Sequence, residues 1–500
     1  MNNGLDRKIQ LTTGTQTNYA DDEFPADLLV ELDRSRPRTL RAQLERGLRQ
    51  AIARKTLAPG TVLPPSRVLA AELGLSRSLV VGAYEQLAVE GYLEARQGSG
   101  TLVRSRPGVG GTPDADRPGN ALYWPIPLGR DGNIPGSGLP DLALFPRDEW
   151  LRHYRDVMRE LPDSGLTYPP PRGVLELRTA LTAYLGRVRG VRTSPDQIVI
   201  CGGFSQGLAL VCRALRRRGV TRVAVEDPCF LLHRNLIASA GMEAVPIPVD
   251  EHGMRTSRLA GLDVGAVLLS PAHSYPSGVL LSADRRVALL NWARATDAFV
   301  IEDDYDAELR YDRLPIGALQ GLDPERVVYG GTVSKVLSPA LRLGWLVMPR
   351  ELVEDVIAAK FREDFASEAL GQFTLARFID SGGLARHLRR VRPVYRARRD
   401  RLLAELDKHL PQLQPSGEAA GLHLLLRLPP GLDPATVSEA AADHGIQLEP
   451  AALHWANRKS APPALLIGYG ALRESTLAHG IAALGDSLRG SATRSIKVMT

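Results

Sequence analysis

The stretch GGTVSKVLSPALRLGW, residues 330–345, combines glycines, hydroxyl side chains, one lysine and one arginine at short spacing. Upstream of it, FVIEDDYD at residues 299–306 ends an apolar run with carboxylates and a phenol. Lys335 offers an amine for an imine, and Asp303 offers an anion for a protonated ring nitrogen. These are groups that pyridoxal phosphate (PLP) requires, so the segment predicts a PLP site with Lys335 as the internal aldimine. Donors for the phosphate are expected from Thr332, Ser334 and Arg342.

A second group of candidate cofactor contacts lies earlier in the chain. The run GGFSQG, residues 202–207, follows an apolar strand pattern and opens a helical one. Free backbone N–H groups and the helix dipole at such a turn attract a phosphate, which makes Phe204 and Ser205 candidates for its lining. Glycine turns between strand and helix are common, so an ordinary turn is the alternative. We expect Phe230 to stack on the pyridine ring and Tyr305 to donate to its phenolate oxygen.

Short apolar runs alternate with long amphipathic segments through the body of the chain. The alternation indicates an α/β domain on a mostly parallel sheet, and 500 residues are too many for a single core. From about residue 350 the pattern turns helical and ends in strands at 422–428 and 464–468, which indicates a smaller α+β lobe. The strands expected in the large domain are 197–201, 222–225, 244–249, 266–270, 298–302 and 326–329.

The segment from about residue 40 to residue 103 has a different pattern. Leucines at 40, 44 and 48 form an amphipathic stripe, and two further helices follow, capped by Ser66 and Ser76 and separated by Gly74. Short β-like runs at 92–95 and 101–103 come next. Helix, helix, tight turn, helix and hairpin make a winged helix-turn-helix, whose last helix enters the major groove. DNA contacts are expected from Arg67 at phosphate, from Arg77 and Ser78 near base edges, and from Ser76, Gln97 and Gly98.

The net charge of +6 is concentrated in this segment. Residues 35–104 hold eleven arginine or lysine residues against five glutamates, so the rest of the chain is neutral. A small basic segment on a neutral body favours a polyanion-binding module, with a solvated charged face as the alternative. Residues 105–120, rich in Gly, Pro and Asp, predict a flexible linker.

Composition narrows the class of protein further. The chain is 44% hydrophobic and 24% charged, and it shows neither an apolar run of membrane-span length nor a signal-peptide core. Three cysteines, at 201, 212 and 229, lack metal-ligand spacing. Buried thiols in a reducing cytoplasm are favoured over a disulfide or a metal site. We therefore expect a cytoplasmic protein that uses neither a metal nor a membrane.

The N-terminal motifs resemble a known family. LPPSR at 63–67, LSRS at 75–78, AY at 83–84 and EGYL at 90–93 with GSGT at 98–101 are similar to the GntR-type DNA-binding domain. Pro65 stands where serine is usual and Leu79 where threonine often follows, which removes the hydroxyl of one phosphate contact. The resemblance implies a GntR-type winged helix-turn-helix over residues 36–104 that binds double-stranded operator DNA.

Residues 121–490 resemble the fold-type I aminotransferases, which implies a PLP-binding domain. Tyr168, upstream of Gly173, matches the tyrosine that such dimers lend to the neighbour's phosphate, and so implies a homodimer. The combination with the head resembles the MocR/GabR family of bacterial regulators. The stretches that carry this resemblance are HSYPSG at 273–278, EDDYDAELRY at 302–311 and TVSK at 332–335. Leu309 replaces the more usual phenylalanine, which is a packing change.

One departure bears on function. Aminotransferases hold the substrate α-carboxylate with an arginine on the last strand of the C-terminal lobe, whereas that strand here reads PALLIGY, residues 463–469. Arg458 and Arg473 flank the strand, and we expect both at the solvated surface. For His273 we expect an imidazole satisfied by local backbone rather than one that contacts the cofactor.

Two functions remain open at this stage. The first is a DNA-binding transcription factor whose PLP domain senses an effector, either PLP itself in vitamin B6 control or an amino compound. The second is a catalytically active PLP-dependent aminotransferase with an accessory DNA-binding head. The complete head, the linker and the missing arginine favour the regulator, because a substrate without its bidentate clamp is poorly oriented for turnover.

Overall fold

The computed structural model describes residues 32–34, 40–54, 56–96, 100–104, 138–311 and 316–498, with side chains up to residue 489 except at residue 96. The chain divides into two compact units, residues 1–121 and 122–500, each with its own hydrophobic core. The predicted linker at 105–120 lies outside the described residues. The exact boundaries 36–104 and 121–490 therefore stay predictions.

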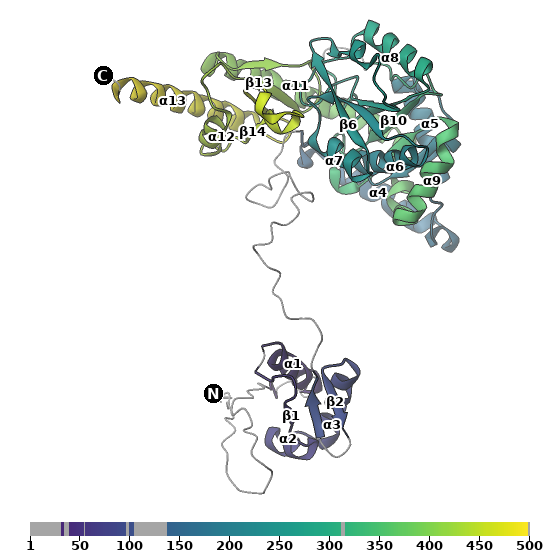
Figure 1. Ribbon diagram of the computed structural model, residues 1–500, viewed down its shortest axis with the longest axis vertical. Helices are drawn as coiled ribbons and strands as arrows, with labels where there is room; N and C mark the ends of the chain where they lie inside the picture. The colour runs from purple at the N-terminus through teal and green to yellow at the C-terminus, as the bar shows by residue number, and fades with distance from the viewer. Residues whose placement is uncertain are drawn as a thin grey trace. The chain divides into compact units, whose positions relative to one another are not determined.

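The N-terminal unit is a winged helix-turn-helix, as the sequence predicts (Figure 1). Its three strands form an antiparallel sheet in the order β1-β3-β2. Leu44 and Leu48 on one helix and Val80 and Leu87 on another are fully buried in its core. The elements are α1 (Leu40–Ala53), β1 (Val62–Leu63), α2 (Ser66–Leu73), α3 (Arg77–Val89), β2 (Leu93–Arg96) and β3 (Gly100–Val103).

The turn between α2 and α3 sets the angle of the third helix. Gly74 adopts φ +57°, a left-handed conformation that glycine enters without steric cost. Ser76 caps α3 by accepting a hydrogen bond from the Leu79 N–H at 3.3 Å. The predicted cap at Ser66 is wrong, because Ser66 is already the first residue of α2 and Pro65 occupies the cap position without a side-chain bond.

The second unit is built on an eight-stranded sheet in the order β4-β11-β10-β9-β8-β5-β6-β7. Neighbouring strands from β10 through β6 are parallel, whereas β11 is antiparallel to both of its neighbours. All six predicted strands are present, whereas β7 and β11 were not predicted. The strands are β4 (Ile198–Cys201), β5 (Arg222–Asp227), β6 (Glu243–Asp250), β7 (Gly253–Met254), β8 (Ala266–Leu269), β9 (Phe299–Asp304), β10 (Val327–Thr332) and β11 (Gly344–Val347).

Helices cover both faces of this sheet (Figure 1). Alternate side chains of one strand enter two cores: Ile198 and Ile200 pack with α5 and α10, while Val199 and Cys201 pack with α6 and α9. Burial on both faces explains why the strands read as continuous apolar runs. The helices are α4 (Arg147–Glu160), α5 (Leu175–Arg189), α6 (Phe204–Arg217), α7 (Leu231–Ser239), α8 (Ala283–Thr296), α9 (Arg350–Asp364) and α10 (Leu370–Asp380).

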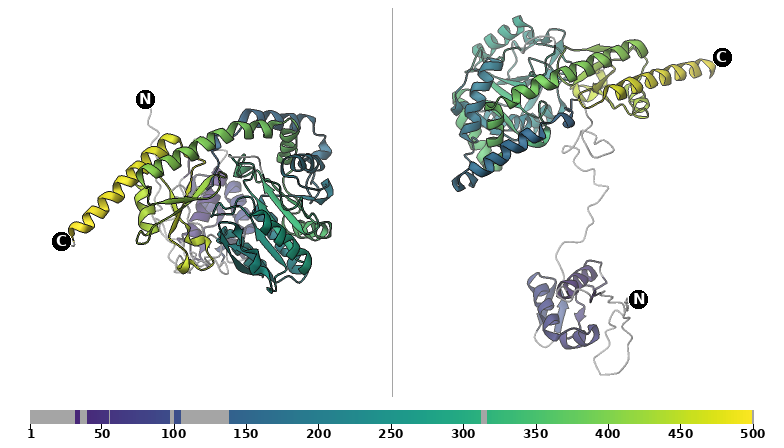
Figure 2. Two further views of the ribbon diagram at one scale, coloured as in Figure 1. Left: turned by 90° about the horizontal axis from the view of Figure 1, so that it is seen from above. Right: turned by 180° about the vertical axis from the view of Figure 1, so that it is seen from behind.

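The C-terminal part forms the expected smaller lobe around a four-stranded antiparallel sheet in the order β12-β13-β15-β14. The long helix α11 (Gly383–His409) leads into this lobe, where α13 lies alongside it (Figure 2). Among the described helices, none is long and apolar enough to cross a membrane. The other elements are β12 (Gln414–Ser416), β13 (His423–Arg427), α12 (Pro434–Ala442), β14 (Leu448–Pro450), β15 (Ala464–Gly468) and α13 (Glu474–Val498).

Three consecutive acids at the end of β9 are buried for different reasons. Because side chains alternate along a strand, Glu302 and Asp304 point to one face and Asp303 to the other. Glu302 accepts two backbone N–H bonds at 3.0 Å. Asp304 Oδ2 lies 2.7 Å from the Nε of Arg189, at the end of α5, and accepts from the Tyr329 hydroxyl at 2.7 Å. Glu302 and Asp304 thus make contacts that stabilise the fold, whereas Asp303 points to the opposite face of the sheet.

One residue of β11 joins two parts of the predicted cofactor site. Gly344 is the ladder partner of Thr332 on one side and of Cys201 on the other. Thr332 leads into the lysine segment, and Cys201 leads into the glycine turn at 202–203. A Cβ built on Gly344 would lie 2.7 Å from the α-carbon of Gly203, so this close approach requires glycine.

Candidate cofactor site and DNA-binding surface

Lys335 lies in the connection between β10 and β11 and is partly buried. Burial lowers the pKa of its ammonium below the usual value, while Asp306 and Asp303 raise it. A Cβ built on Gly138 would lie 3.6 Å from Lys335 Nζ, so backbone covers the amine on that side. A lowered pKa increases the neutral fraction of an amine, which is the form that attacks a carbonyl.

Asp303 is 5% exposed, and only one of its two carboxyl oxygens has a polar neighbour in the described part of the chain. Its Oδ2 lies 3.5 Å from His233 Nε2, whereas Oδ1 has no hydrogen-bond partner among the described residues. Burial first, and then Asp304 and Asp306, hold the pKa of its carboxyl well above the usual value. Burial lowers the pKa of His233 to about 3, so this imidazole supplies no positive charge. A protonated ring nitrogen would supply both the missing donor and the compensating charge.

The glycine turn before α6 fits an anion. Gly203 has φ +107°, and a Cβ built on it would lie 3.4 Å from the guanidinium nitrogens of Arg342. Ser205 lies partly buried in the first turn of α6. Backbone N–H groups at the helix start lie close to the Arg342 guanidinium, and Ser205 adds a hydroxyl in the first turn; these are the kinds of donor that a phosphate needs.

Thr332 and Ser334 form a hydrogen-bonded pair in the lysine segment. Their hydroxyl oxygens are 2.9 Å apart, and the Ser334 N–H donates to Thr332 Oγ1 at 3.1 Å. Thr332 Oγ1 in turn donates to the Leu343 carbonyl at 3.1 Å. The single hydroxyl proton of Thr332 is thus used within the segment and orders it. Phosphate contacts by Thr332 and Ser334 stay predictions.

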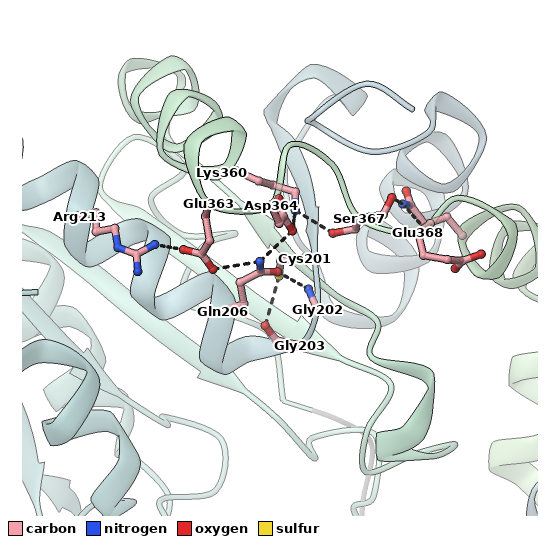
Figure 3. Close-up of polar contacts among 11 residues, drawn as sticks. Cys201, Gly202, Gly203, Gln206, Arg213, Lys360, Glu363, Asp364, Ser367 and Glu368 are labelled. Carbon is pink, nitrogen blue, oxygen red and sulfur yellow. Dashed lines mark hydrogen bonds and ion pairs between the residues drawn. The ribbon is translucent and has the colours of Figure 1, made fainter. Parts of the chain in front are cut away.

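A polar network connects the glycine turn to α9 (Figure 3). Gln206 Oε1 accepts from the Gly202 N–H at 2.6 Å, and its Nε2 donates to Asp364 at 2.9 Å and Glu363 at 3.1 Å. Lys360, which is fully buried, pairs with Asp364 at 2.7 Å. The start of α6 is thereby tied to the end of α9. Of these residues, sequence reasoning singled out the glycine turn alone, because the partners are more than a hundred residues apart.

Phe230, directly before α7, lies among other aromatic rings. Its centroid is 5.4 Å from those of Tyr275 and His233, and 6.2 Å from that of His454, which stacks on it. Phe204 instead packs against β10, where a Cβ built on Gly330 would lie 2.3 Å from its ring. Phe230 thus stays the predicted stacking residue, and Phe204 fills the space that a glycine leaves.

The surroundings of His273 differ from the sequence expectation. Its Nδ1 lies 2.8 Å from Asp306 Oδ2 and 3.0 Å from Tyr305 Oη, so side chains rather than local backbone satisfy it. His423 of β13 lies next to it, with ring centroids 5.3 Å apart. Ligand atoms of His273, Asp306 and His423 lie within 4.8 Å of one another, and this group was not foreseen.

The last strand of the small lobe carries an apolar side chain in a buried cluster that Tyr275 contacts. Leu466 of β15 belongs to a buried cluster with Leu425 and Ala451, against which Tyr275 and Trp455 pack. The flanking residues Arg458 and Arg473 are both exposed, as expected. Among the described side chains of this wall, none supplies the guanidinium that would clamp an α-carboxylate.

Arg234 of α7 holds the small lobe against the large domain. Its Nη1 donates to the His454 carbonyl at 2.6 Å, and its Nη2 donates to the Leu453 and Trp455 carbonyls at 3.0 and 3.1 Å. The loop that contains His454 and Trp455 is thereby placed beside Phe230. This clasp was also missed, because nothing in the sequence relates residues more than two hundred positions apart.

Tyr168 is 80% exposed, and its ring centroid lies 5.2 Å from that of Phe365. Phe365 in turn lies 4.8 Å from Phe361, and both phenylalanines are about half exposed. Three aromatic rings therefore form one exposed group on the large domain. The predicted contact of Tyr168 with a neighbour's phosphate stays a prediction.

The predicted DNA contacts that the structure describes are on the surface of the N-terminal unit. Arg67 is exposed at the start of α2, and Ser76, Arg77 and Ser78 are exposed at the start of α3. Ser76 and Ser78 hydroxyls lie 3.2 Å apart, in addition to the cap bond of Ser76. The two other predicted contacts, Gln97 and Gly98, lie outside the described residues.

Comparison with known proteins agrees with this arrangement. Residues 142–480 match the family model for aminotransferase class I and II, and residues 40–103 match that for bacterial regulatory proteins of the gntR family. In solved structures, a kynurenine aminotransferase of Pyrococcus horikoshii is similar with a TM-score of 0.65 and 28% identity, over 71% of this chain and 90% of that chain.

Curated relatives share both parts. The HTH-type pyridoxine biosynthesis transcriptional regulator PdxR of Corynebacterium glutamicum is 33% identical over 93% of this chain and 99% of its own. The probable rhizopine catabolism regulatory protein MocR of Rhizobium meliloti is 31% identical over 91% and 95%. The similarity covers both the N-terminal segment and the aminotransferase-like domain of this chain. The chain therefore belongs to the MocR family of GntR-type helix-turn-helix transcriptional regulators with an aminotransferase-like domain.

Proposed function

We propose that this regulator senses PLP itself: PLP binds at Lys335, and its binding changes the affinity of the winged helix-turn-helix domain for operator DNA. Control of vitamin B6 supply is the corresponding physiological role. A relative that is 33% identical is described as a pyridoxine biosynthesis regulator, which supports this assignment.

The observation that carries the proposal is the apolar wall at Leu466. The predicted contacts for the ring nitrogen and the phosphate are polar, yet the part of the small lobe that packs against Tyr275 consists of leucine, alanine and aromatic side chains. An amino-acid effector would leave its carboxylate without a bidentate partner there, at a cost typical of an unpaired charge. The site therefore favours the cofactor alone as the ligand.

The protein groups divide the work of binding. Bound PLP supplies an aldehyde for covalent attachment and a conjugated ring that absorbs visible light. Lys335 would provide the amine for this attachment, and Asp303 would hold the ring nitrogen protonated. The start of α6 with Ser205 and Arg342 would bind the phosphate, while Phe230 would orient the ring plane.

Binding to the intergenic DNA upstream of the gene tests the proposal directly. We expect a specific complex at moderate salt whose dissociation constant changes about tenfold when PLP is added. The measurement is an electrophoretic mobility shift titration with and without PLP, with a scrambled duplex as the control. Absence of a specific complex in both conditions contradicts the proposal. Sustained turnover of an amino acid with a keto acid would instead identify an aminotransferase.

Replacing Arg77 with alanine should weaken binding to the specific duplex by about 1–3 kcal/mol, because its side chain is exposed where α3 would meet base edges. Fluorescence anisotropy on specific and scrambled duplexes measures the difference. Arg67→Ala is the matched control, since loss of a phosphate contact should weaken both complexes equally. An equal loss on both duplexes for Arg77→Ala would make Arg77 a phosphate contact instead.

We propose that the protein is a homodimer that covers the exposed aromatic group of Tyr168, Phe361 and Phe365. Phe361→Asp should raise the dimer dissociation constant about a hundredfold, because it places a charge in an apolar contact. Light scattering across a dilution series measures the mass. Val287→Asp on α8 is the control, since Val287 is 56% exposed outside this group. An unchanged mass for Phe361→Asp would show that the dimer forms elsewhere.

A further inference from the structure

A buried hydrogen-bonded chain connects Tyr305 to His273 and Asp306. Tyr305 Oη and Asp306 Oδ2 approach the same ring nitrogen, His273 Nδ1, at 3.0 and 2.8 Å. His273 and Asp306 are each 2% exposed. Tyr305 and Asp306 follow β9, whereas His273 lies in the loop after β8, so two segments of the sheet edge build this chain together.

The number of protons available determines the direction of each hydrogen bond among Tyr305, His273 and Asp306. A ring nitrogen carries at most one proton, and the carboxylate of Asp306, which has none to give when ionised, is the stronger acceptor. The Nδ1 proton is therefore directed to Asp306, and the Tyr305 oxygen can only accept a share of it. The hydroxyl proton of Tyr305 is consequently not used by His273 and is free to be donated to a third group.

Close packing keeps the imidazole in this orientation. A Cβ built on Gly421 would lie 2.4 Å from His273 Cε1 and 2.5 Å from Asp306 Oδ2. A Cβ built on Gly278 would lie 3.4 Å from His273 Nε2. Backbone of the small lobe and of the loop after β8 thus covers the ring, and the ring cannot rotate without displacing backbone.

The groups around this hydrogen-bonded chain of Tyr305, His273 and Asp306 determine the charge of its members. Burial first, and then His273, lower the pKa of His423 well below its usual value, so that this neighbouring ring is neutral. The other ionisable groups near Tyr305 and His273 are Asp303, Glu226, Tyr275, Arg310 and Lys335. Burial, followed by Asp306 and Asp303, raises the pKa of Tyr305 well above its usual value, so its hydroxyl keeps its proton.

We propose that His273 and Asp306 are positioning residues that turn the hydroxyl proton of Tyr305 toward the phenolate oxygen of the cofactor. This inference rests on the proposed PLP binding and adds the device that orients one of its contacts. His273 and Asp306 act through Tyr305 and touch neither the amine nor the phosphate. A hydrogen bond to the phenolate oxygen would reduce the negative charge that stabilises the proton on the nitrogen joining Lys335 to the cofactor, and so would lower the pH at which that nitrogen loses its proton.

The test is the pH midpoint of the visible absorbance of the PLP-loaded full-length protein. Tyr305→Phe should raise the midpoint by about one pH unit, the size expected for one hydrogen bond to a charged group. His273→Phe, which keeps a ring and removes both nitrogens, should raise it by a similar amount. The double variant should show no further shift, because His273 acts only through the Tyr305 hydroxyl.

Two further variants protect the test against a general structural effect. His479→Phe removes an imidazole of α13, which bonds to the Ser475 carbonyl at 2.8 Å, and should leave the midpoint unchanged. Asp306→Asn keeps the side-chain volume and should give a smaller shift in the same direction, even if His273→Phe fails to fold. Circular dichroism confirms that each variant compared is folded.

The outcomes separate this inference from the proposed function. Lack of visible absorbance in the PLP-treated wild-type protein would overturn PLP binding itself. Normal absorbance with wild-type midpoints in His273→Phe and Asp306→Asn would overturn only the positioning role. Shifts of His273→Phe and Tyr305→Phe that add in the double variant would do the same. The alternative is a metal ion bound by His273, Asp306 and His423, which metal analysis of the purified protein tests. A stoichiometric metal that is lost in His423→Asn would make His273 a metal ligand and overturn the assignment.

Discussion

Replacing Lys335 with alanine should abolish the visible absorbance of PLP-treated protein and remove the effect of PLP on DNA binding. The variant lacks the amine of the proposed covalent bond, whereas Asp303 and the α6 turn would still be present to contact ring and phosphate. We therefore expect residual reversible binding without the visible band, rather than complete loss of affinity. Absorbance spectroscopy after gel filtration measures attachment, and mobility shift titration measures the response of the DNA complex.

Lys459→Ala is the matched control for this change. Lys459 is an exposed lysine of the small lobe, so its loss tests whether any accessible amine contributes to the spectrum. We expect wild-type absorbance for this variant. An unchanged spectrum in Lys335→Ala would show that another lysine holds the cofactor, and a retained DNA response would show that covalent attachment is not part of the signal.

Replacing Arg189 with methionine should lower the free energy of unfolding by about 3–5 kcal/mol, the largest stability effect that we expect for a single substitution here. Arg189 and Asp304 pair at 2.7 Å with side chains 0% and 1% exposed. The variant leaves a buried carboxylate whose Oδ1 already has no partner among the described residues. Denaturant unfolding followed by tryptophan fluorescence measures the loss.

Two comparisons identify the cause of that loss. Arg377→Met breaks the exposed pair with Glu160, 2.6 Å apart, and should cost less than about 1 kcal/mol. The double variant Arg189→Met with Asp304→Asn should be more stable than Arg189→Met alone, because it removes the unpaired charge. If both single arginine variants lost the same stability, burial of the ion pair would not be the reason.

The sequence predicted the parts of the site that are contiguous in the chain. Lys335 and Asp303 stand in motifs whose residues are adjacent, and the parallel strands that position them read as apolar runs because both faces are buried. The strand β11 was missed although its residues, Gly344–Val347, overlap the quoted motif. A strand of four residues that immediately follows a loop has too short a pattern to distinguish from the loop itself.

The contacts that depend on distant segments were not predictable from this sequence. His273 and Asp306 are 33 positions apart, and Arg234 meets carbonyls more than two hundred positions away. Hydrophobic periodicity places elements but does not specify which polar side chains meet when they pack. The cap at Ser66 failed for a local reason, since a serine one position inside a helix start has the same sequence appearance as a serine at the cap.

The shared ladder position of Gly344 has a consequence for the evolution of this family. Because backbone pairing joins the lysine segment to the glycine turn through one strand, the spacing of these two segments does not depend on nearby side chains. A change of side chain in the small lobe, for example at Leu466, would leave that spacing undisturbed. One scaffold can thus serve both enzymes and gene regulators, because side chains of one wall can change while backbone pairing fixes the other.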